Sequence, residues 1–178
     1  MFGNLFNNKS NLNLLIFSIF LLVFDQVSKA MIVSQFDLYE SIPVAPFFNL
    51  TFVVNYGFAF GFLNSPSLNQ IIVSIVILSI IIYFLYLLIK TQDHFFKLCL
   101  VLILSGAVGN FLDRIFRGYV VDFIDIYVFN YHWPAFNIAD SAITIGAVML
   151  GLDVVFEARR EKAAAAKAEN ESQDTGKE

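Results

Sequence analysis

Residues 71–89 form an uncharged run of 19 residues without proline, made almost entirely of Ile, Val, Leu, Phe and Tyr. An α-helix rises 1.5 Å per residue, so about 20 such residues cross the ~30 Å hydrocarbon core of a bilayer. This run therefore predicts a transmembrane helix over about residues 69–90, and it limits the chain to folds that place a helix in lipid.

The composition of the whole chain agrees with a membrane protein. Of its 178 residues, 58% are hydrophobic and only 15% are charged, whereas soluble domains contain about 25% charged residues. An ordinary soluble globule and a disordered chain are therefore excluded. Cys99 is the only cysteine, which excludes a disulfide scaffold, and the net charge of −4 argues against a nucleic-acid partner.

Three further apolar segments predict spans over about residues 12–32, 95–114 and 136–156. The first could also be the apolar core of a cleaved signal peptide. We favour a membrane helix because the apolar run resumes after residues 25–29, with no convincing small-residue cleavage site. The expected architecture is an all-α membrane protein with four transmembrane helices in one domain, residues 1–157. A charged, disordered tail is expected over residues 158–178.

The basic residues predict the orientation of these helices. Lys9, Lys90, Lys97 and the cluster at residues 159–162 fall on one side, and the segment 34–67 on the other side has no Lys or Arg. By the positive-inside rule both termini are cytoplasmic. Arg114 and Arg117 lie at the opposite end of the third span and need a local explanation.

The segment 34–67 is too long for a simple hairpin loop. Pro43 and Pro46 interrupt it, residues 47–54 are typical of a strand, and residues 55–57 (Asn-Tyr-Gly) favour a turn. We expect a small extracytoplasmic β-rich cradle that holds something amphiphilic. A plug that packs onto the helix ends is the alternative.

Ionisable residues at membrane depth are costly and therefore mark candidate functional sites. Asp25 and Lys29 are four residues apart on one helical face and are interpreted as a structural polar pair. The pattern N-x-x-D occurs twice, as Asn110 with Asp113 and as Asn137 with Asp140. Arg114 follows Asp113 directly and offers it a cation.

Asp122 and Asp140 have no cation within a helical turn in the sequence. If the two carboxyl groups share a pocket of low dielectric constant, they cannot both ionise freely, so the pair holds one proton. Such a pair can deprotonate a water and protonate a leaving amine, as in aspartic proteases. Asp125 competes for the place of the second carboxylate, and the sequence leaves that choice open.

The sequence lacks the motifs that other classes of peptidase require. It has no H-E-x-x-H and no G-x-S-x-G motif. His94 falls on the opposite loop, His132 fits an interfacial aromatic cluster, and Cys99 is interpreted as a buried thiol. We predict neither a metal nor a cofactor.

Five blocks in order resemble the bacterial lipoprotein signal peptidases, also called type II or prolipoprotein signal peptidases. They are D-Q-V-S-K (25–29), N-Y-G-F-A-F-G (55–61), G-A-V-G-N-F-L-D-R (106–114), V-V-D-F (120–123) and F-N-I-A-D-S (136–141). The resemblance implies a membrane aspartic endopeptidase that cleaves diacylglyceryl-modified prolipoproteins just before the lipidated cysteine.

The resemblance also implies roles for particular residues. The catalytic dyad falls on Asp122 and Asp140. Positions that bind substrate or support the site fall on the following residues: Asn55, Gly57, Asn110, Asp113, Arg114 and Asn137. Phe60 stands where many relatives carry Trp. Arg114 is expected to hold substrate carbonyls, with pairing to Asp113 or to lipid phosphates as the alternative.

The expected partners are lipid-modified prolipoproteins and membrane lipids, with the enzyme acting as a monomer. The expected location is the bacterial cytoplasmic (inner) membrane, with the active site near the extracytoplasmic face. We expect the signal helix of the substrate to contact small residues such as Gly106, Gly109, Ala142 and Gly146. A small transporter with a carboxylate proton relay and a non-catalytic assembly factor are the competing hypotheses.

Overall fold

A computed structural model of the protein describes residues 9–57 and 66–175. It contains helices α1 (Lys9–Gln35), α2 (Pro66–Lys90), α3 (His94–Phe116) and α4 (Ile138–Thr175). Each has a segment long and apolar enough to cross a membrane, so the prediction of four spans is confirmed. Helix α1 is continuous over 27 residues and passes straight through residues 25–29.

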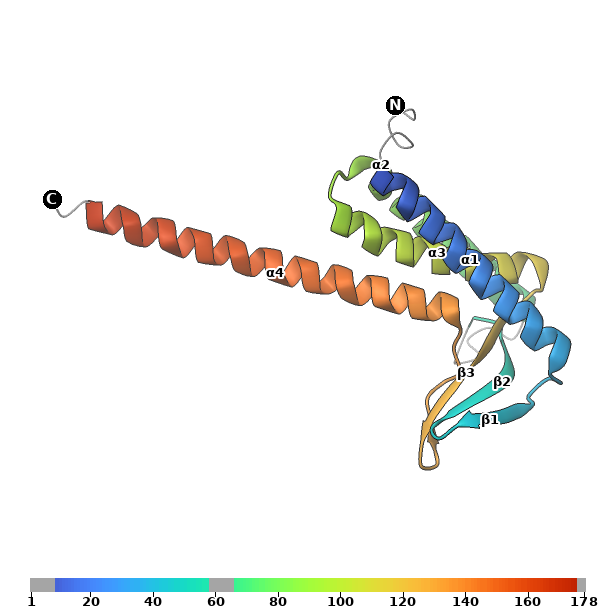
Figure 1. Cartoon of the computed structure of the whole chain (residues 1–178). Helices are drawn as coiled ribbons and strands as arrows, with labels where there is room; N and C mark the ends of the chain where they lie inside the picture. Colours follow the sequence, from blue (N-terminus) through green and yellow to red (C-terminus); the bar gives the residue numbers. More distant parts are fainter. Residues whose placement is uncertain (1–8, 58–65, 176–178) are drawn as a thin grey trace.

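Helix α3 is the centre of the bundle, and α1, α2 and α4 all pack against it (Figure 1). Thirteen of its residues between Lys97 and Asp113 are buried. The outer helices instead expose large apolar side chains such as Ile82 on α2, which is 60% exposed. These faces suit lipid, because hydrocarbon tails solvate them as well as another helix would.

Small residues let α3 and α4 approach each other closely. A Cβ added at Gly106 would lie 2.2 Å from the backbone oxygen of Ala139, and one at Gly146 would lie 2.8 Å from the backbone oxygen of Cys99. Gly109 faces Asp25 on α1. The expectation that these residues receive the signal helix of a substrate is therefore wrong, because helices of this chain already occupy those surfaces.

A four-stranded antiparallel sheet lies at one end of the helices (Figure 1). Its order is β1 (Ser41–Ala45), β2 (Phe48–Asn55), β3 (Val120–Val128) and β4 (Tyr131–His132). The β-rich segment expected over 34–67 is confirmed for β1 and β2. The second half of the sheet comes from the connection between α3 and α4, which the sequence patterns did not show to be strand. The part of the predicted segment at residues 58–65, with Phe60, lies outside the described residues.

The sheet is attached to the end of α1 by a small apolar cluster. Ile32 of α1, Phe52 of β2, and Val121 and Phe123 of β3 are buried together. Pro43 lies on β1, an edge strand of the sheet. A residue without a backbone N–H is tolerated there, because one side of an edge strand has no neighbouring strand to bond. The apolar cluster holds the sheet in a fixed position over the ends of the helices.

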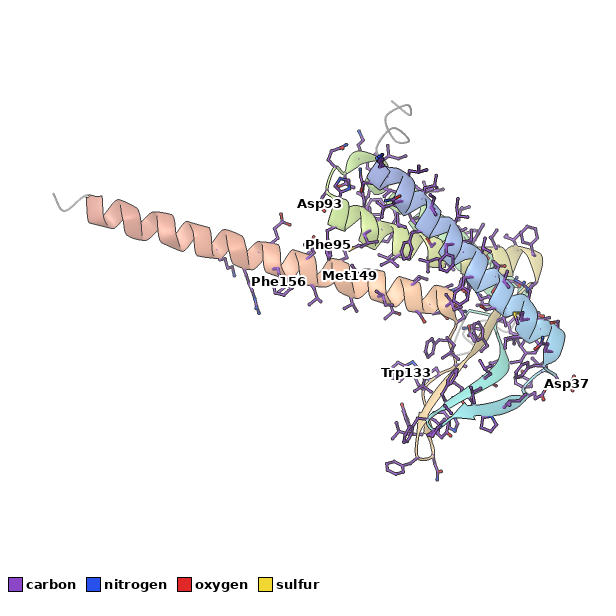
Figure 2. The ribbon with its side chains drawn as sticks, in the orientation of Figure 1. Asp37, Asp93, Phe95, Trp133, Met149 and Phe156 are labelled. Atoms are coloured by element: carbon purple, nitrogen blue, oxygen red, sulfur yellow. The ribbon has the colours of Figure 1, made fainter. Side chains whose placement is uncertain are left out.

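The disordered tail expected over residues 158–178 differs from the structure, in which α4 continues to Thr175. The extension projects beyond the other helices, past Phe156 (Figures 1 and 2). Its sequence explains this, since Ala, Glu and Lys dominate it and no Pro or Gly occurs between Gly151 and Gly176. These residues have high helix propensity.

The close approach of α3 and α4 gives a stability prediction. We expect Gly106→Ala to lower the free energy of unfolding by about 1–3 kcal/mol, because the new methyl group meets a backbone oxygen that cannot move away. Thermal unfolding of the purified protein in detergent measures the change.

Gly151→Ala is the matched control, because a Cβ at Gly151 meets nothing within 4 Å. There the higher helix propensity of Ala should leave stability unchanged or raise it by about 0.5–1 kcal/mol. Equal melting temperatures for the Gly106→Ala variant and the parent would contradict the packing described above.

Candidate active site

Strand β3 carries Asp122 to the junction between the sheet and the helices. Its side chain is almost fully buried, and its partner on β2 is Val53. Successive side chains of a strand point to opposite faces, so Asp125, three residues on, points away from Asp122. Asp125 accepts hydrogen bonds from Asn49 Nδ2 (2.7 Å) and binds His132 Nδ1 (2.9 Å). The structure thus separates the two acids between which the sequence could not choose.

Asp140 lies in the first turn of α4, where it forms a capping box with Asn137. Asn137 Oδ1 accepts from the backbone N–H of Asp140 (2.9 Å), and Asp140 Oδ2 accepts from the backbone N–H of Asn137 (3.2 Å). Reciprocal bonds of this kind satisfy helix N–H groups that have no partner in the helix. The second N-x-x-D motif is therefore a helix start rather than two residues within a span, and it fixes the backbone that carries Asp140.

Asn137 also connects the two candidate catalytic acids. Its Nδ2 donates to Asp122 Oδ1 (2.7 Å), while its backbone N–H donates to Asp140. The side chain is fully buried and donates further to the backbone oxygen of Val121 (3.2 Å). One residue therefore holds a carboxyl group of β3 and a carboxyl group of α4 next to each other.

Asn55 and Gly57 hold Asp122 from the other side. Asn55 Nδ2 donates to Asp122 Oδ2 (3.0 Å), and the backbone N–H of Gly57 donates to Asn55 Oδ1 (2.8 Å). The second bond leaves only the amino group of Asn55 free to face the acid. Gly57 has φ of +97°, a conformation that favours glycine, so the turn orients the Asn55 amide.

A buried ion network lies beneath the two acids. Lys29 Nζ contacts Asp25 Oδ2 (2.8 Å) and Asp113 Oδ2 (2.9 Å), and all three side chains are at most 2% exposed. Lys29 also donates to Asn110 Oδ1 (2.9 Å), and Asn110 Nδ2 donates to Asp140 Oδ1 (2.7 Å). The predicted pair of Asp25 and Lys29 thus reaches the candidate dyad through one amide.

Asp113 has other partners than the adjacent Arg114 suggested by the sequence. It binds Lys29 and Arg117 Nη1, and its Oδ2 lies 3.4 Å from the backbone nitrogen of Val121 at the start of β3. Arg117 follows Asp113 by four residues on the same helical face, a spacing that could have indicated the pair. Gln26 donates to Asp25 and Asp113, and no pattern in the sequence indicated these contacts.

Arg114 lies half-buried beside the candidate dyad. Its Nη1 donates to the backbone oxygen of Asn110 (3.0 Å), and its Nε is buried without a hydrogen-bond partner among the described residues. Gln70 Nε2 of α2 donates to the backbone oxygen of Arg114 (2.8 Å). Both side chains line a cavity of about 450 Å³ between α2 and α3, where an acceptor could reach the guanidinium.

The electrostatic setting of Asp122 suits a carboxyl group that exchanges protons. Burial, and secondly the charge of Asp140, raise its pKa to about 6. The hydrogen bonds from Asn55 and Asn137 and the charge of Lys29 oppose this rise. Because both nearest donors are neutral amides, Asp122 keeps access to a proton near neutral pH.

Side chains suited to other chemistries lie elsewhere. In residues 9–57 and 66–175, no three His, Cys, Asp or Glu side chains are grouped so that they could hold a metal ion. Cys99 is fully buried in α3, and His94 Nδ1 binds Ser10 Oγ (3.1 Å). The structure brings together nine of the polar residues predicted from the sequence: Asp122, Asp140, Asn55, Asn110, Asn137, Arg114, Asp113, Asp25 and Lys29.

Comparison with known proteins identifies the relatives of this arrangement. A family described as signal peptidase (SPase) II matches residues 17–156. Lipoprotein signal peptidases of Cupriavidus necator and Alteromonas mediterranea are 47% and 46% identical to the chain. The first match covers 81% of this chain and 83% of the relative, and the second covers 74% of each.

Solved structures give the same result. A bacterial membrane enzyme determined by the in meso method superposes with a TM-score of 0.71 at 36% identity, covering 82% of this chain and 89% of the other. The chain therefore belongs to the signal peptidase II family, whose members are aspartic peptidases.

Proposed function

We propose that this lipoprotein signal peptidase cleaves diacylglyceryl-modified prolipoproteins just before the lipidated cysteine, with Asp122 and Asp140 activating water. The observation that carries the proposal is that Asn137 binds both acids: it donates to Asp122 through its side chain and to Asp140 through its backbone N–H. Among the described residues neither acid forms a salt bridge. Two buried acids that are held together by neutral amides can share one proton, as the reaction requires.

The chemistry follows from that shared proton. The ionised carboxylate takes a proton from a water, whose oxygen attacks the carbonyl carbon of the peptide bond before the cysteine. The protonated carboxyl group gives its proton to the carbonyl oxygen. As the tetrahedral intermediate collapses and the C–N bond breaks, the carboxyl group that took the proton of the water gives it to the amine of the new N-terminal cysteine. One hydroxyl group of the intermediate returns its proton to the other carboxylate, so the products are a carboxylic acid and an amine, and the dyad again holds one proton. The residues of the chain supply every proton transfer.

Arg114 is proposed to hold the substrate backbone. Its buried Nε lacks a partner in the described part of the chain, and the Arg114 side chain lines the cavity between α2 and α3. A peptide carbonyl placed there would accept this N–H and convert an unsatisfied donor into a hydrogen bond. Asp113 is engaged by Lys29 and Arg117, which leaves Arg114 free for this task.

The setting in the cell is part of the proposal. The chain acts in the bacterial inner membrane as a monomer, with both termini cytoplasmic and the dyad near the extracytoplasmic face. The distribution of Lys and Arg between the two sides supports this orientation. The lipid of the substrate stays in the bilayer, while β1 and β2 cover the peptide. Membership of a peptidase family removes the reason to consider a transporter.

The dyad is tested by three isosteric substitutions. We expect Asp122→Asn and Asp140→Asn each to lower kcat for a lipidated precursor by roughly 10²–10⁴-fold, because each removes a group that transfers protons. Precursor and mature lipoprotein are separated by gel electrophoresis.

Asp125→Asn is the matched control, since Asp125 points away and binds His132 and Asn49. It should retain most of the activity. Loss of cleavage in Asp125→Asn together with full activity in Asp122→Asn would reassign the second carboxylate.

The pH dependence gives a separate test. We assign the shared proton to Asp122, whose pKa is about 6. As the pH rises through this value the free enzyme loses the proton, so kcat/KM should fall by about tenfold per pH unit on the alkaline side. Asn55→Ala removes a hydrogen bond that favours the ionised form of Asp122, so it raises the pKa of Asp122. The alkaline limb of the pH profile, where kcat/KM falls, should therefore move to higher pH.

Asn49→Ala, which removes an amide bound to Asp125 instead, should leave the position of the limb unchanged. An unaltered limb in Asn55→Ala would show that a group other than Asp122 sets it. The pH profile of kcat/KM for each variant decides between these results.

A further inference from the structure

A second cavity lies between α1 and α2 and extends along α3 from Lys97 to Val108. Both helices pack against α3, yet within the described residues they do not contact each other. The space between them is a cavity of about 380 Å³. It is lined by Asn11, Leu14, Leu15, Ser18 and Leu22 of α1, Leu85, Leu88 and Ile89 of α2, and Lys97, Val101, Leu104, Ser105 and Val108 of α3.

The dimensions of this cavity match one leaflet of a bilayer. Its lining on α1 runs from Asn11 to Leu22, which is about 17 Å at 1.5 Å per residue. That length is about half of the ~30 Å hydrocarbon core. The volume lies within the ~300–1,000 Å³ usual for sites of small ligands. An extended acyl chain is the kind of molecule that a bilayer offers to such a space.

The two hydroxyl groups in the middle of the cavity need no ligand. Ser18 Oγ and Ser105 Oγ form a hydrogen bond with each other (2.9 Å), and Ser105 Oγ also donates to the backbone oxygen of Val101 (2.7 Å). The remaining interior is aliphatic. The middle of the cavity is therefore suited to hydrocarbon.

The end of the cavity next to the loop between α2 and α3 is different, because it holds a buried cation. Figure 2 labels Asp93 and Phe95 at this end. Lys97 is only 6% exposed. Among the described residues the only hydrogen bond of the Lys97 side chain is to Asn11 Oδ1 (3.2 Å), and no carboxylate forms a salt bridge with it. Asp93 instead caps α3 by accepting from the backbone N–H of Phe96.

An ammonium group has three N–H donors, and a buried one without an anion is costly. An amphiphile with an anionic head would supply the missing charge at Lys97 while its chain fills the aliphatic part. The buried cation and the apolar channel of leaflet length thus point to the same ligand.

We propose that this cavity binds one acyl chain of an anionic phospholipid from the leaflet next to the chain termini, with the lipid phosphate at Lys97. The bound lipid fills the wedge between α1 and α2 and completes the packing around α3. The inference does not depend on the proposed peptidase mechanism, because the dyad lies at the other end of the bundle.

Quenching of tryptophan fluorescence by brominated lipids tests the site in the full-length protein. Trp133, the only tryptophan, lies on the sheet and is replaced by Phe. Leu15→Trp then places the probe in the cavity, and Ile16→Trp places it at the same depth on the outer, 57%-exposed face of α1. The proteins are reconstituted in phosphatidylcholine nanodiscs that contain a few per cent of brominated phosphatidylglycerol or brominated phosphatidylcholine.

We expect half-maximal quenching of the Leu15→Trp protein at about a fivefold lower mole fraction of phosphatidylglycerol than of phosphatidylcholine, the order of effect of one lysine near anionic lipid. The Ile16→Trp protein should respond equally to both lipids. Adding Lys97→Met should abolish the preference. Adding Lys90→Met should leave it intact, since Lys90 lies outside the cavity over the ring of Tyr86.

Equal quenching of the Leu15→Trp protein by the two lipids would overturn the proposal, and that comparison needs no change at Lys97. A preference that survives in Lys97→Met would also overturn it. If Lys97→Met does not fold, Lys97→Arg takes its place. Arg keeps the charge, so a lost preference in that variant would count against an electrostatic origin.

Discussion

The buried ammonium of Lys29 is the interaction on which the site depends. It joins Asp25 of its own helix to Asp113 of α3 and donates to Asn110, all without access to water. Buried ion pairs add little net stability, but removing one partner leaves a buried charge without compensation. Arrangements of the helices that separate the partners are therefore costly. Asp25 extends the network to α4 by accepting from the backbone N–H of Ala139 (2.9 Å). Three of the four helices are therefore held in register at the level of the dyad.

The network also separates two classes of acid. Asp25 and Asp113 face the cations Lys29 and Arg117, so two negative charges meet two positive ones. Asp122 and Asp140 instead accept hydrogen bonds from the neutral amides of Asn55, Asn110 and Asn137. The amides orient the carboxyl group of Asp122, while burial and the charge of Asp140 raise its pKa to about 6 against the opposing effect of these hydrogen bonds. Asp25 and Asp113, which are paired with cations, hold the helices in place. By our proposal, Asp122 and Asp140 exchange protons.

Lipid takes part in this fold as a solvent and, by our inference, as a ligand. Helices α1 and α2 expose large apolar side chains over most of their length, and their mutual packing is incomplete near the end where the termini lie. At the opposite end α1 is tied to the sheet by Ile32, Phe52 and Val121. The helices and the sheet are thus held by many contacts around the dyad, whereas α1 and α2 leave a cavity at the other end that has room for a lipid chain.

The sequence alone determined the four membrane helices, because a continuous apolar run such as residues 71–89 has only one stable form in hydrocarbon. It also showed which acids lack a neighbouring cation, and it carried the motifs of the family. Contacts between distant residues were decided by the tertiary structure. Asp113 pairs with Lys29, 84 positions away, and with Arg117, rather than with the adjacent Arg114. The strand that carries Asp122 pairs with β2, which lies about 70 positions earlier in the chain. Asn137 caps a helix and joins two acids because α4 begins where β3 passes. Spacing along a chain predicts local periodicity, but these pairings depend on where helices and strands cross, which packing around α3 decides.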